Sequence, residues 1–562
     1  MESVLKMKKR LFLIALAATS ILVLSSCKKE NIEEKKNGIS IICTSDVHAD
    51  ANNSKNNNTY SNILAFRDNR KDKGYYTSLV DCGDYIQGGQ LGILSQGEYL
   101  IDIMNEMEYD VCTVGNHEFD YGIDRFSYLS KKFNGSMISC NLKYIGDHEN
   151  KLDNIGDYKI LEYGDTKVGF IGVTTPEAIT KSTPAYFMED GEFAYSFGNE
   201  SKDEFYSTVQ TSIDTCKSDG ADYVVLLAHL GYGEEYGDFS SLALLENISG
   251  IDAMFDGHSH KVKPTEFHED KDGNAVPLAC LGTKLSCFGE IIIDDLGLTL
   301  NSITSYPKTS NKMESYFDTL DSKTAEKLNE VVATSDTKLS INDSNGVRLC
   351  RNSETTCGNF VADMCRYVYN TDIGFINGGG VRSDLPIGNI TYGNLLDLAP
   401  YYNKMVVIEA TGQQILDYLE FGACKRKSNT YAQDGTSAGE FGGFVLPSGL
   451  KYSIDTSIES SAIFDSNGIL QGFGDTRRVK DVYVLKNNSY QPIDVDATYT
   501  IGGIAYPLLE KGDGNTAFDG CNVLVDSNAG ILDIEGIIRY INEELNGNLS
   551  TYSTLEGRIT II

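Results

Sequence analysis

The amino-terminal half of this chain is predicted to form an α/β domain, followed by a smaller α+β domain. Short apolar runs alternate with segments in which apolar residues recur at helical spacing, which is typical of a layered α/β domain. Acidic and histidine-containing motifs follow these apolar runs. At 562 residues the chain is also too long for one hydrophobic core, so two large domains are expected.

Four apolar runs in the first half are predicted to be strands that lead into polar motifs. They are residues 39–42, 77–80, 109–114 and 251–255. Residues 98–107 carry apolar side chains at helical spacing and are predicted to form a helix. Functional groups in such sheets gather at the carboxyl ends of strands, so the motifs should meet at one edge.

A polar segment that is helical in character and lacks a clear strand separates the two halves. We place the first domain at residues 38–310, a linker helix at 311–337 and the second domain at 338–562. The second domain is predicted to contain a helix and two strands. These are a helix at 358–369 and strands near 404–410 and 499–502.

The chain is strongly acidic, with a net charge of −32. This charge argues against binding of nucleic-acid polymers or anionic lipids through the general surface. An anionic substrate would not be attracted by the bulk surface either. Any phosphate site must therefore be made positive locally, by metal ions and a few arginines.

The amino terminus has the features of an export signal. A basic patch at residues 8–10 precedes a mostly apolar run at 11–24, which is too short to span a bilayer comfortably. The run ends in Leu-Ser-Ser-Cys27, which resembles a bacterial lipobox and implies a lipid on Cys27. Residues 1–26 are then a lipoprotein signal peptide and 27–37 a tether. A plain secretory signal or an uncleaved anchor is the alternative.

On this interpretation the protein is exported. It would be lipid-anchored on the outer side of the bacterial cytoplasmic membrane or lie in the periplasm. The other twelve cysteines are scattered. Cys43, Cys82 and Cys112 lie in or beside apolar runs and are expected to be small core residues. A local bridge between Cys350 and Cys357 stays open.

Five short motifs contain five of the seven histidines of the chain. They also supply aspartates, a glutamate and a side-chain amide, which together are enough ligands for two metal ions. Two divalent ions roughly 3.5–4 Å apart form a clamp for phosphoester chemistry. The motifs are Asp46-Val47-His48, Asp81-Cys82-Gly83-Asp84, Gly115-Asn116-His117-Glu118, the single His229 and Gly257-His258-Ser259-His260.

The spacing within two motifs suggests how their side chains point. Asp46 and His48 are two residues apart after a strand, so an extended backbone would direct both side chains the same way. His258 and His260 have the same spacing and can reach two different ions. A pair of solvent-facing histidines is the alternative for these last two.

The remaining motifs each offer one ligand. Asp84 is our choice for a carboxylate that bridges both ions, whereas Asp81 is expected to brace the turn. Asn116 offers a carbonyl oxygen, and its neighbour His117 is free for another task. His229, considered alone, is more typical of a structural residue than of a metal ligand.

In this order the motifs resemble those of the calcineurin-like metallophosphoesterases. The closer resemblance is to the secreted 5′-nucleotidase family, which includes UDP-sugar hydrolases, ecto-5′-nucleotidases and 2′,3′-cyclic-nucleotide phosphodiesterases. It is carried by residues 44–48, 81–88, 115–120 and 257–260. The resemblance implies a four-layer β-sandwich with flanking helices, then a linker helix and a smaller α+β nucleotide-binding domain.

The resemblance also implies roles for the motif residues. His117 would contact the phosphoryl group, and Asp120 would orient its imidazole; a helix N-cap is the alternative for Asp120. The ions could be zinc, manganese, cobalt or iron. One ion would be held by Asp46, His48, Asp84 and His260, and the other by Asp84, Asn116, His229 and His258.

The second domain would hold the rest of the substrate. Residues 350–359 and the loop 377–382 resemble segments of the family's nucleotide-binding domain. Tyr401 follows a proline, as the family's first base-stacking ring does, although phenylalanine is usual there. Tyr506 precedes a Gly-Asp-Gly turn, but the spacing is about one residue long; core packing is the alternative for both tyrosines. The implied substrate-binding residues are Arg351, Asn377, Arg382, Tyr401, Tyr506 and Asp513.

We therefore expect an extracytoplasmic two-metal phosphohydrolase that acts on a nucleotide and no nucleic-acid polymer. Nucleoside 5′-monophosphates are the expected substrates, with UDP-sugars, ADP and ATP also in range. One alternative is a 2′,3′-cyclic-nucleotide 2′-phosphodiesterase with 3′-nucleotidase activity. An alternative of another class is a non-catalytic nucleotide-binding surface lipoprotein.

Overall fold

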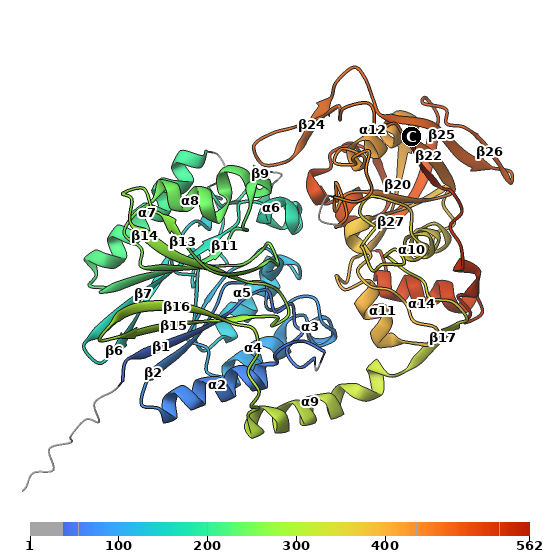
Figure 1. Ribbon diagram of the computed structural model, residues 1–562. Helices are drawn as coiled ribbons and strands as arrows, with labels where there is room; N and C mark the ends of the chain where they lie inside the picture. The colour runs from blue at the N-terminus through green and yellow to red at the C-terminus, as the bar shows by residue number, and fades with distance from the viewer. Residues whose placement is uncertain (1–36, 54, 191, 199–200, 433–435, 528) are drawn as a thin grey trace, which may run out of the picture.

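The protein is described by a computed structural model that covers residues 37–562, apart from residues 54, 191, 199–200, 433–435 and 528. The predicted signal peptide, Cys27 and nearly all of the tether lie outside the described residues. The described chain forms two domains that lie side by side, with helix α9 running along both (Figure 1).

The first domain contains two six-stranded sheets. In the first sheet the strands β1 to β4 are parallel, and two antiparallel strands follow at the β1 edge. The order is β16 (Gly297–Ile303), β15 (Phe288–Asp294), β1 (Ile39–Thr44), β2 (Tyr76–Asp81), β3 (Val111–Thr113) and β4 (Ser136–Ile138).

The second sheet has four parallel strands in its middle and an antiparallel strand at each edge. The order is β13 (Val262–Glu269), β14 (Ala275–Leu281), β12 (Ala253–Asp256), β11 (Tyr223–His229), β7 (Thr166–Thr174) and β6 (Tyr158–Tyr163).

Alternating side chains on the strands separate the layers of this domain. Ile41 and Cys43 of β1 join Phe170 and Phe255 in the apolar layer between the sheets. Ile42 points to the other face, into the core shared with one set of helices. These helices are α2 (Tyr60–Asp72), α4 (Glu98–Glu106) and α5 (Ile123–Lys132), whereas α7 (Lys202–Ser218) and α8 (Ser241–Asn247) cover the second sheet. The predicted four-layer architecture is confirmed.

The predicted elements of this domain are present with small shifts. Strands β1 and β2 run further than predicted, to Thr44 and Asp81, and the helix expected at 98–107 is α4. The strand expected at 109–114 is shorter, because only Val111–Thr113 pairs as β3. Each of these strands ends at or just before a predicted motif.

Helix α9 (Asn311–Leu328) connects the domains. Its side chains Met313 and Phe317 are buried in the core of the first domain, and the helix also contacts α11 (Tyr392–Leu398) of the second. The helix ends at Leu328, before the predicted end of the linker at residue 337. Val331–Ser335 instead forms β17, which pairs with β19 (Gly388–Thr391), as expected for a run rich in β-branched residues.

The second domain contains a five-stranded mixed sheet and a four-stranded sheet, with helices packed on them. The predicted helix and two strands correspond to α10 (Thr356–Tyr367), β20 (Met405–Thr411) and β27 (Thr498–Ile504), so the α+β prediction is confirmed. The first sheet has the order β21 (Val445–Ser448), β18 (Ile373–Asn377), β27, β20 and β28 (Asn522–Val525). The second has the order β26 (Ser489–Pro492), β25 (Val479–Lys486), β22 (Leu450–Ile454) and β29 (Ile559–Ile561).

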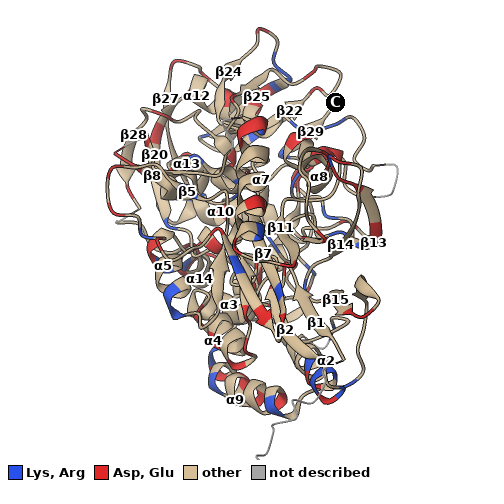
Figure 2. Cartoon of the chain, turned by 90° about the vertical axis from the view of Figure 1, so that its left-hand side faces the viewer, with Lys and Arg blue, Asp and Glu red and all other residues tan. Residues whose placement is uncertain are grey.

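The cysteines of the described chain are all free, so Cys350 and Cys357 form no bridge. Cys43, Cys82 and Cys112 are fully buried, as predicted for core residues. The colours in Figure 2 show acidic and basic residues interspersed along the surface helices, for example along α9. Within the described residues, no helix has both the length and the apolar character needed to cross a membrane.

Candidate active site

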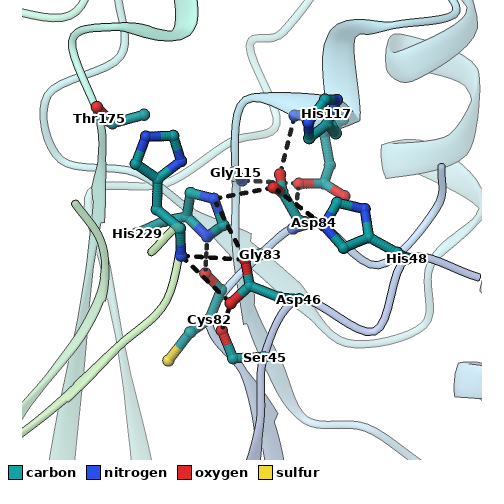
Figure 3. Close-up of polar contacts among 12 residues, drawn as sticks. Ser45, Asp46, His48, Cys82, Gly83, Asp84, Gly115, His117, Thr175 and His229 are labelled. Carbon is teal, nitrogen blue, oxygen red and sulfur yellow. Dashed lines mark hydrogen bonds and ion pairs between the residues drawn. The ribbon is translucent and has the colours of Figure 1, made fainter. Parts of the chain in front are cut away.

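The predicted motifs meet where strands of the two sheets end. The side chains of Asp46, His48, Asp84 and His229 face a common space (Figure 3). The described residues contain two groups of potential metal ligands, and within each group the ligand atoms all lie within 4.8 Å of one another. Asp84 belongs to both groups. The first group is Asp46, His48, Asp84 and His260, and the second is Asp84, His229 and His258. These groups agree with the two sets that the family resemblance implied, except that Asn116 is not a member of the second group.

Distances within these groups fit cations at their centres. Nε2 of His48 lies 3.0 Å from Nε2 of His260 and 3.8 Å from Oδ2 of Asp84. Nε2 of His229 lies 3.1 Å from the same Asp84 oxygen, and Nε2 of His260 lies 3.5 Å from Oδ1 of Asp46. Imidazole nitrogens and two carboxylates therefore converge from separate loops.

Buried polar atoms test whether metal ions fit this site. Oδ1 of Asn116 is buried and has no hydrogen-bond partner among the described residues, and the buried Nε2 of His229 has the Asp84 carboxylate oxygen at 3.1 Å as its contact there. Such atoms are costly to bury unless something binds them. Nδ1 of His229 lies 2.7 Å from the carbonyl of Cys82, which directs the other nitrogen, Nε2, toward the ligand space. The mixed nitrogen and oxygen donors suit zinc, manganese, iron or cobalt.

Without a cation these groups share protons. Burial alone would lower the pKa of His229, but Asp84 and Asp46 outweigh this effect and raise it to about 10. Burial also opposes ionisation of Asp84, yet His229 and His117 hold the pKa of that carboxyl well below its usual range. The proton on His229 thus neutralises the same carboxylates, Asp84 and Asp46, that a divalent cation would neutralise.

The ligands do not converge through an extended backbone, so that part of our reasoning was wrong. Strand β1 ends at Thr44, and Asp46 and His48 both have φ of 49°. The left-handed conformation also occurs at Asp84, His258 and His260, with φ of 60°, 68° and 55°. It costs roughly 1–2 kcal/mol for a residue with a side chain, and such strain collects at functional sites.

Hydrogen bonds between the loops hold this strained backbone. The N–H of Asp46 donates to the carbonyl of Gly83 at 2.9 Å, and the N–H of His48 donates to the carbonyl of Asp84 at 2.9 Å. A Cβ on Gly83, whose φ is +99°, would lie 2.6 Å from the N atom of Gly115. Glycine is therefore needed where these two ligand loops touch.

Glu118 is a positioning residue that our sequence reasoning left without a role. Its buried carboxylate accepts hydrogen bonds from the backbone N–H groups of Asp84, Tyr85 and Gly115, at 2.8, 2.9 and 2.7 Å. It thereby fixes two ligand loops together. Asp81 braces its turn as expected, accepting from the N–H of Gly83 at 2.7 Å. An acidic residue inside a ligand motif was the sequence signal for Glu118.

His117 and Asp120 form a pair beside the ligand groups. Nδ1 of His117 lies 2.6 Å from Oδ2 of Asp120, and the Ser182 hydroxyl donates to the other oxygen at 3.3 Å. Gly122 is the N-cap of α5, so the N-cap alternative for Asp120 is wrong. Burial would lower the pKa of His117, but Asp120 and Asp84 outweigh it and raise the pKa.

A cleft of about 1310 Å³ lies between the two domains. Its wall in the first domain includes Asp84, Asn116 and His117. The ring of Tyr401 approaches His117 across the cleft, with 6.5 Å between ring centroids and 25° between ring planes. All six predicted substrate residues line its other wall: Arg351, Asn377, Arg382, Tyr401, Tyr506 and Asp513.

Five arginines of the second domain line the cleft, and Arg348, Arg351 and Arg382 are close enough to affect one another electrostatically. Arg348, which our sequence reasoning missed, pairs with Glu440, with its Nε 2.9 Å from Oε1. Neither Arg351 nor Arg382 has a carboxylate within 4 Å among the described residues. Burial, together with Arg382 and Arg348, lowers the pKa of Arg351 to about 10. Unpaired guanidinium groups at close range are suited to bind an anion.

Tyr506 and the Gly-Asp-Gly turn pack together despite their unusual spacing. The N–H of Asp513 donates to the Tyr506 hydroxyl at 3.0 Å, and a Cβ on Gly512 would lie 2.4 Å from the Tyr506 ring. Asn377 donates through Nδ2 to the carbonyl of Gly442 at 3.1 Å. Its Oδ1 is buried without a partner among the described atoms.

The two-sheet domain and its ligand groups define a metallophosphoesterase. Residues 39–262 match the calcineurin-like phosphoesterase family, and residues 331–520 match the 5′-nucleotidase C-terminal domain. The chain therefore belongs to the metallophosphoesterase/5′-nucleotidase family, whose members are hydrolases.

Similar proteins share this plan at low sequence identity. The "Trifunctional nucleotide phosphoesterase protein YfkN" of Bacillus subtilis is 24% identical over 442 residues, which cover 70% of this chain but only 28% of that longer protein. A "2′,3′-cyclic-nucleotide 2′-phosphodiesterase/3′-nucleotidase" of Haemophilus influenzae is 25% identical, covering 74% of this chain and 72% of that one. A 5′-nucleotidase of Bos taurus is 24% identical, covering 86% and 81%.

A solved structure supports the fold. A 5′-nucleotidase precursor from Thermus thermophilus aligns with a TM-score of 0.71 and 22% sequence identity. The alignment covers 93% of this chain and 99% of that one, so both domains are matched.

Proposed function

We propose that this protein is a metal-dependent hydrolase that releases phosphate from nucleotides, above all from nucleoside 5′-monophosphates. UDP-sugars, ADP and ATP lie within the same proposal. One observation carries it: a single cleft has members of both ligand groups on one wall and, on the other, two tyrosine rings and two arginines that have no carboxylate partner among the described residues.

The residues have distinct proposed tasks. The seven ligand residues would hold two divalent ions, which would supply Lewis-acid polarisation of the phosphate and a lowered pKa for an attacking water. Arg351 and Arg382 bind the phosphate oxygens. His117, held by Asp120 at Nδ1, offers its other nitrogen to the phosphoryl group and to the leaving oxygen. Its raised pKa favours the protonated form that can donate.

The nucleoside is proposed to bind between Tyr401 and Tyr506, with Asn377 and Asp513 contacting its polar groups. Stacking on an aromatic ring contributes about 1–3 kcal/mol per base. Both rings line the same cleft as the arginines, which supports a substrate with a flat base at one end and phosphate at the other.

A 2′,3′-cyclic-nucleotide phosphodiesterase with 3′-nucleotidase activity is the second candidate. The Haemophilus influenzae relative of that name aligns over 489 residues, across both domains. It would use the same ligand groups and differ in how ribose and base are placed.

We further propose that the protein is exported and anchored by a lipid on Cys27. The amino-terminal sequence supports this proposal. Replacing Cys27 with serine should move the protein from the membrane fraction to the soluble fraction, whereas unchanged partitioning would contradict a lipid anchor.

Phosphate release from a panel of substrates tests the activity. The protein starting at residue 28 is supplied with manganese, zinc or cobalt and given AMP, ATP, UDP-glucose or 2′,3′-cyclic AMP, with His117→Ala as the control. Strong AMP turnover that the variant loses supports the 5′-nucleotidase proposal. Preference for the cyclic ester favours the second candidate. Nucleotide binding without turnover under any metal would instead indicate a non-catalytic binding protein.

A further inference from the structure

Helix α6 (Ala178–Lys181) lies between the candidate metal centre and the nucleotide pocket. Glu177 is its N-cap residue, and Oε2 of Glu177 lies 3.4 Å from Nε2 of His258. Thr180, in the same short helix, accepts a hydrogen bond at 3.2 Å from the hydroxyl of Tyr506 in the second domain. A few consecutive residues therefore touch a candidate metal ligand of one domain and a proposed base-stacking ring of the other.

Further contacts join α6 to the second domain. It packs against η5 (Gly512–Gly514), whose Asp513 N–H donates to the same Tyr506 hydroxyl. Charges on the two domains are complementary here. Burial raises the pKa of Asp513, and Lys181 of the first domain and Lys425 of the second partly offset that rise. The Tyr506 hydroxyl thus lies within a polar contact between the domains.

The orientation of His258 explains why this contact matters. Its Nε2 faces Glu177, which leaves Nδ1 for a metal ion. Histidines that bind metals commonly donate their other N–H to a carboxylate, and loss of that partner typically weakens metal binding about 10–100-fold. The Glu177 side chain is 41% exposed, so its position depends on what holds the α6 segment in place.

We propose that α6 couples the contact between the domains to the second metal group, with the Tyr506 hydroxyl and Glu177 as positioning residues. When Tyr506 docks on the carbonyl of Thr180, the segment holds Glu177 against His258 and orients that imidazole. By thermodynamic reciprocity, metal in the second group favours the docked position of Tyr506. The inference rests on the proposed function only in taking these groups as the metal and nucleoside sites.

Binding of Mn²⁺ alone, followed by the electron paramagnetic resonance signal of the free ion, tests this coupling without any substrate. Glu177→Gln should weaken one of the two Mn²⁺ sites about 10-fold, the one that contains His258. Tyr506→Phe keeps the ring and removes only the hydroxyl, and it should weaken the same site about threefold. The double variant should bind Mn²⁺ no more weakly than Glu177→Gln does, because both changes interrupt the same chain of contacts.

Tyr401→Phe is the matched control. It removes a hydroxyl from the same cleft at a ring outside the hydrogen bonds that join α6 to the second domain, and it should leave Mn²⁺ affinity unchanged. Thermal unfolding of each variant checks that the fold is intact. Unchanged Mn²⁺ binding by Tyr506→Phe, additive losses in the double variant, or an equal loss in Tyr401→Phe would each overturn the proposal.

A second measurement separates this inference from the proposed activity. Adenosine, which has no phosphate to hydrolyse, should tighten Mn²⁺ binding in the wild type and fail to do so in Tyr506→Phe. If the protein released no phosphate from any nucleotide, the activity proposal would fall while the Mn²⁺ coupling could still be found. If nucleotides were hydrolysed but the variants left Mn²⁺ binding unchanged, only the proposed role of α6 would be contradicted.

Discussion

The two walls of the cleft differ in charge and in how their side chains are held. The wall of the first domain carries carboxylates and imidazoles on left-handed backbone, fixed by buried hydrogen bonds such as those to Glu118. The wall of the second domain carries aromatic rings and arginines, of which Arg351 and Arg382 have no carboxylate partner among the described residues. One wall is suited to hold cations rigidly, and the other to receive an anion with a flat group attached.

This difference suggests a division of labour. A cluster of acids and histidines decides which reaction is possible, and it tolerates little movement because metal geometry is strict. The opposite wall decides which phosphoester is brought to it. Changes in the first wall should therefore abolish the reaction with every substrate, whereas changes in the second should alter affinity and preference.

The largest effect is expected for Asp84→Asn, which removes the carboxylate shared by both ligand groups. Loss of several kcal/mol of transition-state stabilisation corresponds to a fall of about 1,000-fold or more in kcat. Removal of metal with a chelator should have a similar effect on the wild type. Steady-state phosphate release and Mn²⁺ stoichiometry measure the outcome, and two tightly bound ions in the variant would contradict a bridging role.

His117→Ala should lower kcat by about 100- to 10,000-fold and leave Mn²⁺ binding intact. The reason is that His117 lies beside the ligand groups but does not belong to either of them. Asp120→Asn should give a smaller loss of the same kind. If His117→Ala lost Mn²⁺ affinity to the same extent as turnover, metal binding and catalysis by the first wall would not be separable.

Arg351→Ala should raise KM for AMP and lower kcat/KM about 10- to 100-fold, because a hydrogen bond to a charged group contributes about 1.5–3 kcal/mol. Arg348→Ala serves as the comparison, since the guanidinium of Arg348 already forms an ion pair with Glu440. The Arg351 effect should be the larger one at unchanged Mn²⁺ affinity. A loss in Arg348→Ala as large as that in Arg351→Ala would assign phosphate binding to the whole arginine cluster.

Tyr401→Leu should lower affinity for nucleotides by about 1–3 kcal/mol while leaving turnover of a simple phosphate ester such as p-nitrophenyl phosphate nearly unchanged. Tyr401→Phe keeps the stacking face and should change neither by more than about threefold. Competition by adenosine measures the effect on the base site alone. A similar loss with both substrates would place Tyr401 in the chemistry and not in base recognition.

The smallest effect on activity is expected for Asp533→Asn. Asp533 contacts Asn403, which lies two residues after Tyr401. Burial raises the pKa of Asp533 to about 7, and the backbone and side-chain N–H groups of Asn403 donate to its Oδ2 at 3.3 and 3.2 Å. In the unfolded chain the pKa is about 3.9. Between these values the folded state keeps a proton that the unfolded state has lost, so the free energy of unfolding falls as pH rises.

The Asn variant lacks this titration. Its stability relative to the wild type should therefore increase between pH 5 and pH 8, by roughly 1–3 kcal/mol, with kcat unchanged. Urea unfolding at several pH values checks the sign. A constant difference between the two proteins across this range would mean that Asp533 is ionised in the folded state throughout.

The sequence by itself determined the layered architecture, the two-domain plan and the ligand motifs. Apolar periodicity and strand-end motifs are local properties, so β1, β2 and α4 were found within a few residues of their observed ends. The linker helix was predicted too long, because the β-branched run after Leu328 pairs with a strand far along the chain.

Only the tertiary structure decided how the motifs converge and what supports them. No spacing rule describes the left-handed backbone at five ligands. Most of the other supporting features are contacts between residues distant in sequence: the hydrogen bonds to Glu118 from the loop of Asp84, the pairing of Arg348 with Glu440 and the contact of Tyr506 with Thr180. Periodicity reports which face of an element is buried, whereas such contacts depend on which other element arrives at that face.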